Sequence, residues 1–107
     1  MAYWPSVKAT ELFRQKTVLK HRDGVRLAIF EVVIFKIPVS NYYPDGIKYR
    51  AWFSEGGKTV FGFDNHKPKG PHLHIGEDEI GYVFRGVKDL RADAEAMIEK
   101  AGYIYEK

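Results

Sequence analysis

The sequence predicts an α+β protein in which an antiparallel β-sheet of four to six strands carries a C-terminal α-helix packed on one face. Two observations support this prediction. Short apolar and alternating runs, separated by turn signals, fill most of the chain up to residue 85, and only residues 88–101 carry a helical apolar repeat. The length of 107 residues fits a single domain over residues 1–107, with an irregular N-terminal segment at residues 1–9.

Turn signals divide the first part of the chain into strands. Asp23-Gly24 is typical of a tight hairpin, because glycine readily adopts the positive φ that such a turn needs. The run before this turn is partly exposed, whereas the run after it is apolar on both faces, as in a central strand, and ends at Pro38. The strands expected here are residues 10–22, 25–37, 47–54 and 59–64.

The second part of the chain begins with an expected functional loop at residues 65–79, where prolines and glycines interrupt regular structure. Within it, residues 72–76 could form a short extended piece, and residues 80–85 resemble a last strand. A helix is expected over residues 88–101, with Gly102 suited to the position after its end. Its apolar face consists of Leu90, Ala94, Met97, Ile98 and Ala101.

Composition excludes several classes of protein. The chain has no cysteine, which rules out disulfides, thiolate metal sites and a cysteine nucleophile. No apolar run approaches the roughly 20 residues that span a bilayer, and no signal peptide is visible at residues 1–6. We therefore expect a cytoplasmic protein without membrane contact.

Charge is unevenly distributed along the chain. The net charge is +3, but residues 1–76 hold twelve basic and six acidic residues, whereas residues 77–107 hold five and eight. A basic body with an acidic C-terminal third is compatible with a polyanionic ligand such as nucleic acid. Charge alone favours the simpler interpretation that the basic side chains solvate strand faces.

Residues 64–74 hold the densest set of reactive side chains. Three of the four histidines lie here, together with Asp64, Asn65, Lys67 and Lys69. If residues 72–74 are extended, both histidines of this stretch point to the same face. A purely structural role for the whole cluster is the less favoured interpretation, although the isolated His21 is expected to be solvated.

Three chemical uses of this cluster remain open. Two imidazoles, completed by Asp64 or His66, could hold a metal ion, although the flanking lysines argue against a cation. Histidines could instead cleave RNA as general acid and base, since their pKa lies near neutral pH. The third use is phosphate binding without cleavage, by the lysines and by backbone amides around Gly70.

Two positions in the expected strands also have alternative interpretations. Glu31 interrupts an apolar face, so it either pairs with a cation such as Arg50 or lies at an exposed edge. Alternation places Trp52 on the face of Lys48 and Arg50, where it could stack on a base or pack under the helix. The same alternation favours a core position for Tyr49.

The sequence resembles the TumE family of prokaryotic toxins over most of its length, from about Leu12 to Ala101. The resemblance is most specific at residues 63–65 (Phe-Asp-Asn) and 69–74 (Lys-Gly-Pro-His-Leu-His). It is supported by residues 48–50 (Lys-Tyr-Arg), by the strand end at residues 37–38, and by the aromatic run at residues 82–84. Phe63 replaces a tyrosine that is usual in the family, and Pro71 replaces a residue that is commonly polar.

This resemblance implies a toxin that cuts RNA and is neutralised by a cognate antitoxin with a helix-turn-helix DNA-binding fold. Combined with the chemistry above, it gives the hypothesis of a metal-independent endoribonuclease that needs no cofactor. His72 and His74 are the general acid and base, in an order that the sequence does not define. Lys69 and Arg50 bind the scissile phosphate, and Asp64 orients an imidazole and, with Asn65, holds the loop.

The remaining RNA contacts are assigned to Asn65, His66, Lys67 and Lys48. The alternatives are a nucleic-acid- or phosphate-binding module that does not cut, or a histidine-ligated metalloprotein. RNA and the antitoxin are the expected partners, and a homodimer is one of the assemblies left open.

Overall fold

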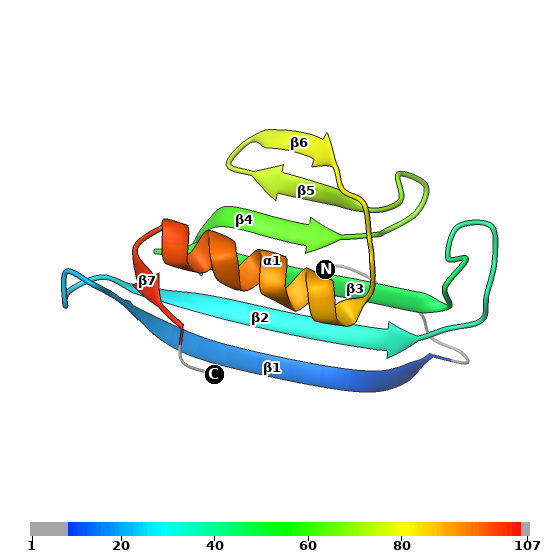
Figure 1. The fold of residues 1–107 in the computed structure, drawn as a ribbon, viewed down its shortest axis with the longest axis horizontal. Coiled ribbons are helices and arrows are strands. Elements are labelled where there is room, and N and C mark those ends of the chain that lie inside the picture. Colours follow the sequence, from blue (N-terminus) through cyan, green and yellow to red (C-terminus); the bar gives the residue numbers. More distant parts are fainter. Residues whose placement is uncertain (1–8, 106–107) are drawn as a thin grey trace.

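The structure is a computed structural model that describes residues 9–105. These residues form one sheet and one helix (Figure 1). The expected irregular segment at residues 1–9 therefore lies almost wholly outside the described residues. The elements, in chain order, are β1 (Thr10–His21), β2 (Leu27–Lys36), β3 (Ile47–Glu55), β4 (Lys58–Asp64), β5 (His72–Ile75), β6 (Asp78–Gly81), α1 (Val87–Lys100) and β7 (Tyr103–Ile104).

The sheet is antiparallel throughout and has the strand order β6-β5-β4-β3-β2-β1-β7. The α+β class is confirmed, but the expected four to six strands were too few, because the sheet has seven. The segment at residues 65–79, expected to be a loop, contains β5 and the start of β6, joined by a turn at Gly76. Residues 80–85 are not a separate strand, because β6 ends at Gly81 and the chain then leaves the sheet for α1.

The hairpin between β1 and β2 follows from its turn residues. Gly24 has φ 78°, and the Asp23 carboxylate accepts hydrogen bonds from the backbone N–H groups of Val25 and Arg26. His21, expected to be solvated, packs edge-on against the Tyr103 ring at 4.9 Å instead. It does so because β7 pairs with the end of β1 and brings Tyr103 beside it.

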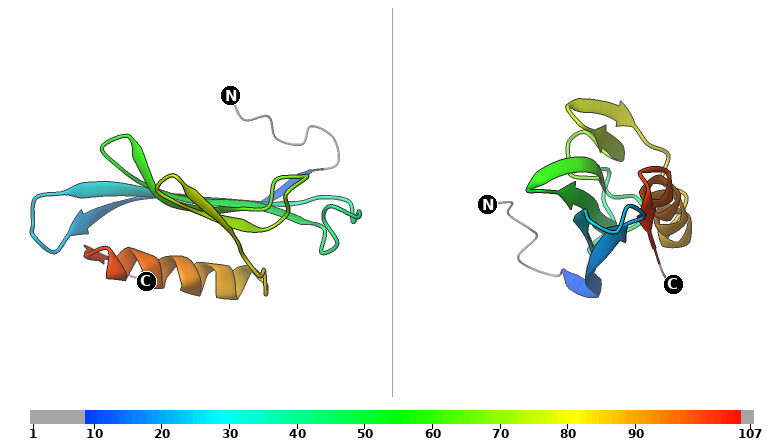
Figure 2. Two further views of the ribbon diagram at one scale, coloured as in Figure 1. Left: turned by 90° about the horizontal axis from the view of Figure 1, so that it is seen from above. Right: turned by 90° about the vertical axis from the view of Figure 1, so that its left-hand side faces the viewer.

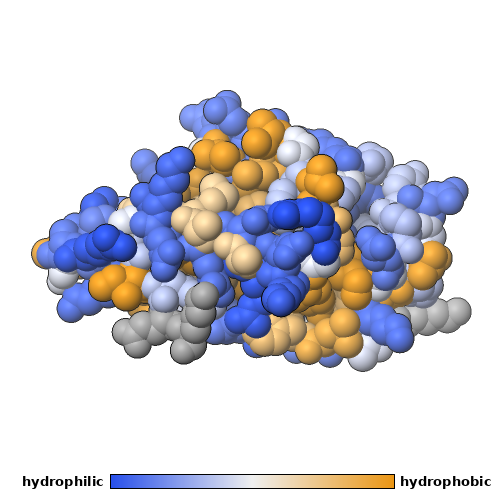
Figure 3. Space-filling view, in the orientation of Figure 1, coloured by the Kyte–Doolittle hydropathy of each residue, from blue (hydrophilic) through white to orange (hydrophobic). Residues whose placement is uncertain are grey.

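The core lies between α1 and one face of the sheet (Figure 2). Alternation along the strands directs aromatic and branched side chains to this face, and Tyr49 is fully buried in it, as expected. Leu90, Ala94 and Ile98 are the buried residues of α1 and form its sheet-facing stripe. The helix lies over the central strands, and apolar side chains remain visible over β4–β6 beyond it (Figure 3).

The opposite face of the sheet is covered by no helix or strand of residues 9–105 (Figure 2). We call it the open face. Alternation directs many of the polar strand residues here. Glu31 is exposed as expected, but on the open face of an interior strand and not at an edge of the sheet. No helix of the described chain is long and apolar enough to cross a membrane. The open face is therefore where a ligand can reach side chains that the rigid sheet positions.

Candidate functional site

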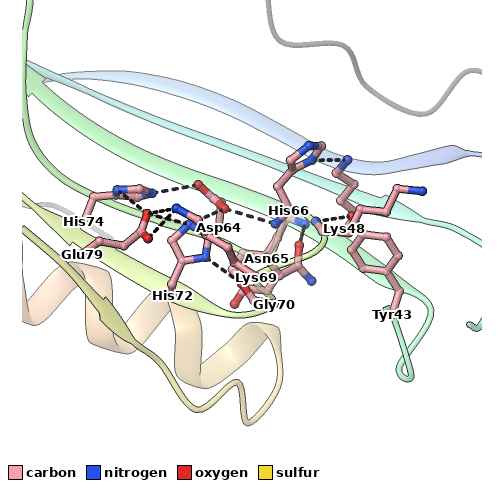
Figure 4. A network of polar contacts seen from close by, with 12 residues as sticks. Tyr43, Lys48, Asp64, Asn65, His66, Lys69, Gly70, His72, His74 and Glu79 are labelled. Carbon is pink, nitrogen blue, oxygen red and sulfur yellow. Dashed lines mark hydrogen bonds and ion pairs between the residues drawn. The ribbon is translucent and has the colours of Figure 1, made fainter. Parts of the chain in front are cut away.

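Strand pairing brings Asp64, His72 and His74 together on the open face (Figure 4). Asp64 is the last residue of β4 and pairs with His72, while His74 pairs with Gly62. Residues two apart on one strand share a face, so both imidazoles lie beside the Asp64 carboxylate. Gly62 contributes no side chain, which leaves the space beside His74 open to a neighbouring ring.

The Asp64 carboxylate lies between the two histidines. Its Oδ1 is 3.1 Å from Nε2 of His72, and its Oδ2 is 3.4 Å from Nε2 of His74. The two imidazole rings meet edge to face, with centroids 4.6 Å apart. The His72 side chain is 9% exposed and the His74 side chain 26%, so the cluster is partly buried and opens toward His74.

The Nδ1 atoms of both histidines face a hydrogen-bond acceptor. Nδ1–H of His72 donates to the backbone carbonyl of Gly70 at 2.7 Å, so in the neutral ring Nε2 carries no hydrogen. Nδ1 of His74 lies 3.5 Å from Oε2 of Glu79, a residue of β6. The same Glu79 oxygen is 3.6 Å from Nε2 of His72.

Glu79 is the site residue that sequence reasoning missed. It pairs with His74 across the β5–β6 hairpin, so the signal would have been the turn at Gly76, which places residues 74 and 79 opposite each other. Nζ of Lys69 binds both carboxylate oxygens of Glu79, at 2.7 and 3.1 Å. The hydrogen bond from Lys69 lowers the pKa of Glu79, so this carboxyl is charged near neutral pH.

Trp52 and Arg50 extend the site along β3. The indole of Trp52 is 5.1 Å from the His74 ring, and the Arg50 guanidinium carbon is 4.8 Å from the Trp52 ring centroid. A Cβ at Gly62 would be 2.2 Å from the indole, so only glycine lets the ring lie down on the sheet there. Trp52 is half-buried on the open face and does not pack under the helix.

Lys48 and His66 form a second polar group, set apart from the histidine pair (Figure 4). Nζ of Lys48 is 2.9 Å from Nδ1 of His66, and burial lowers the pKa of both side chains. His66 therefore does not join the cluster. Of the two residues considered as a third metal ligand, Asp64 lies beside the histidine pair and His66 does not. Lys67 extends over the Tyr42 ring at 5.5 Å, away from the same cluster.

Asn65 attaches the loop to the sheet. Its Oδ1 accepts the backbone N–H of Tyr49 at 3.0 Å, and its Nδ2 donates to the carbonyl of Ile47 at 2.8 Å. The residue is buried, with 6% of its surface exposed. Both ends of its amide are therefore used to hold residues 64–66 against β3.

The fold and the site define a small α+β protein with a histidine–carboxylate cluster on the uncovered face of its sheet. A sequence model of the family described as Toxin TumE matches residues 5–101 of the chain. The chain therefore belongs to the TumE toxin family, as its motifs predicted, and a toxin of this kind implies an antitoxin partner. Comparisons with curated proteins and with solved structures gave no significant match.

Proposed function

We propose that this toxin is a metal-independent endoribonuclease that cuts RNA with His72 and His74 as general acid and base. The observation that carries the proposal is the placement of two imidazoles on one open face, both in contact with Asp64. A neutral His72 would direct its Nε2 lone pair at a carboxylate, because its Nδ1–H is held by Gly70. A proton on Nε2 relieves that repulsion and makes the ring a proton donor.

The reaction needs one proton acceptor and one proton donor. One imidazole takes the proton of the ribose 2′-OH, and this oxygen attacks the adjacent phosphorus. The other imidazolium gives its proton to the 5′-oxygen as the P–O5′ bond breaks, leaving a 2′,3′-cyclic phosphate and a 5′-hydroxyl. Asp64 lies between the rings and stabilises whichever one carries the proton.

Cations around the cluster would hold the scissile phosphate. Arg50 lies across the β3–β4 pair from Asp64, stacked on Trp52, and Lys69 reaches the cluster edge through Glu79. A phosphate would compete with Glu79 for the ammonium of Lys69, whose side chain is 62% exposed. Trp52 offers an aromatic surface for a base beside the bond to be cut.

The RNA backbone on either side would follow the remaining polar residues of the loop and of β3. These contacts would include Lys48, His66 and Lys67, which form a basic group beside the cluster. Asn65 would act mainly by fixing the position of His66 and Asp64, since its amide already holds the backbone of β3.

We also propose that the antitoxin is a helix-turn-helix DNA-binding protein and that the toxin acts in the cytoplasm. Growth arrest on expression, relieved by a helix-turn-helix protein encoded beside the toxin, is the expected result. If the adjacent reading frame has another fold and still relieves the arrest, the assignment of the antitoxin class is wrong. Sedimentation of the purified toxin then decides between a monomer and a homodimer.

The test of the reaction is an RNA cleavage assay with purified protein, with and without EDTA. His74→Ala is expected to lower the rate by about 10²- to 10⁴-fold, the usual contribution of a general acid or base. His72→Ala is expected to do the same, and circular dichroism checks its folding because His72 is largely buried. His21→Gln, on the distant β1–β2 hairpin, is the matched control and should cut normally.

The outcomes separate the competing functions. Full activity in both His72→Ala and His74→Ala would contradict the assignment of these residues as general acid and base. Salt-sensitive RNA binding without any cleavage would select the non-catalytic binding module instead. Loss of wild-type activity in EDTA would select a metal-dependent reaction, which the closeness of ligand atoms in Asp64, His72 and His74 makes the second candidate.

A further inference from the structure

The two histidines are oriented in a way that also suits metal binding. Metal-bound histidines commonly donate one ring N–H to a carbonyl or carboxylate, which orients the other nitrogen toward the metal. His72 has this arrangement with the Gly70 carbonyl, and His74 has Glu79 beside its Nδ1. In both rings the opposite nitrogen, Nε2, faces the same carboxylate, Asp64.

The distances suit a transition metal. Ligand atoms of Asp64, His72 and His74 all lie within 4.8 Å of one another. Two nitrogen ligands and one oxygen ligand around Zn²⁺, each about 2.1 Å from the ion, would lie about 3.4 Å apart. The Asp64–Nε2 separations, 3.1 Å from Oδ1 to His72 and 3.4 Å from Oδ2 to His74, are close to this value, and a rotation of the carboxylate would present a single oxygen to both rings.

The charges around the cluster also permit a cation. In the sequence, the lysines that flank the histidines argue against a bound cation. In the structure, Lys69 is bound by Glu79 and Lys67 lies over Tyr42. Lys48 is next to His66 rather than beside the cluster. The cationic group of Arg50 lies over the Trp52 ring. The Asp64 carboxylate is therefore the charge nearest to both Nε2 atoms.

We propose that Asp64, His72 and His74 form a binding site for a zinc-class divalent cation. The two Nε2 atoms and one Asp64 oxygen supply three ligands, and water or Glu79 completes the tetrahedron. The ion occupies the place that a proton takes in the proposed ribonuclease, so zinc and proton transfer exclude each other. Binding stands independently of the proposed function, whereas the inhibition that follows from this exclusion rests on it.

The experiment is isothermal titration of untagged, metal-free protein with Zn²⁺, supported by the visible spectrum with Co²⁺. The expected result is one ion per chain and a cobalt spectrum typical of tetrahedral coordination. Asp64→Asn and His74→Ala should each weaken binding at least about tenfold. His66→Gln is the matched control for metal binding, because this histidine of the same segment faces Lys48 and should leave zinc affinity unchanged.

Thermal unfolding gives a readout that does not depend on RNA. Zinc should raise the melting temperature of the wild type, and the rise at the same zinc concentration should be smaller in Asp64→Asn. Absence of saturable binding by the wild type, or equal binding by wild type and Asp64→Asn, would overturn the site. Binding that weakens in His66→Gln as much as in His74→Ala would overturn the assignment of ligands.

Inhibition is measured on the same preparation. Zinc should slow RNA cleavage by the wild type, and EDTA should restore it. Stimulation of cleavage by zinc would overturn the exclusion of proton transfer by the metal. A protein that binds one zinc ion but cuts no RNA under any condition would defeat the ribonuclease proposal and leave the metal site standing.

Discussion

Single residues decide the shape of the open face beside the cluster. Trp52 lies against the sheet only because residue 62 is glycine, and its Nε1–H donates to the hydroxyl of Thr59 at 2.8 Å. This position brings the indole to His74 and provides the surface on which Arg50 stacks. One missing Cβ therefore links the packing of the sheet to the candidate site.

Gly62→Ala should displace the Trp52 ring, because the new Cβ would lie 2.2 Å from it. We expect a loss of about 1–3 kcal/mol in the free energy of unfolding, typical of overpacking, together with weaker RNA binding. Urea unfolding and an RNA titration measure the two effects. Gly81→Ala is the matched control, since a Cβ there meets nothing within 4 Å. Equal stability of the two variants would contradict this account of the ring.

Secondary-structure elements divide into those that the sequence predicts and those that it does not. The strands β1 to β4 and the helix α1 lie close to their expected ranges, because their runs are long enough for periodicity to be visible. β5 and β6 have four residues each and β7 has two, which is too short for a pattern. They exist because neighbouring strand edges offer them hydrogen-bond partners.

The candidate site divides in the same way. His72, His74 and Asp64 could be proposed from local spacing, because β4 and β5 are joined by a short connection. Glu79 was missed because its place depends on the register of the β5–β6 hairpin, and the local signal for that hairpin is the turn at Gly76 alone. The separation of His66 from the other histidines depends on its long-range contact with Lys48, which no local pattern contains.

Asn65→Ala tests how the loop is attached to β3. The substitution leaves the Tyr49 N–H and the Ile47 carbonyl without their side-chain partner, which should cost about 1–3 kcal/mol of unfolding free energy. Asn41→Ala, at an exposed bend, should cost far less in the same urea titration. If both variants unfold at the same urea concentration, the two hydrogen bonds of the Asn65 amide contribute nothing to stability.

Alternation of side chains along the strands gives the sheet two different faces. One face is closed by α1 and holds the core, and the other presents the cluster and its neighbouring cations. The basic segment 1–76 carries the two histidines, Asp64 and the cations beside them, whereas the acidic C-terminal third contributes Glu79 to the site and includes the helix on the far side. An anionic ligand would therefore approach the open face under the more favourable electrostatic field.

Three tyrosines with raised pKa values make the folded protein less stable at high pH. Burial, with the hydrogen bond to Asp93, raises the pKa of Tyr82 to about 12, and burial with Glu55 raises that of Tyr103 to about 12. Burial also raises the pKa of Tyr49. Above pH 10 the unfolded chain loses these protons before the folded protein does, so folding stability falls as pH rises from about 10 to 12.

Urea titrations over this pH range, compared with Tyr82→Phe, test the alkaline loss of stability. The variant lacks one of the three raised groups, so its unfolding free energy should fall less steeply with pH than that of the wild type. Identical slopes would show that Tyr82 keeps an ordinary pKa in the folded protein.

The most direct test of the proposed reaction is mass spectrometry of the products from a short RNA and from the same strand with 2′-deoxyribose throughout. Attack by the 2′-oxygen predicts cleavage of the RNA in EDTA, initial fragments that end in a 2′,3′-cyclic phosphate, and no cleavage of the deoxy strand. Cleavage of both strands, or first products that end in a 3′-hydroxyl, would contradict the assignment of His72 and His74 as its general acid and base.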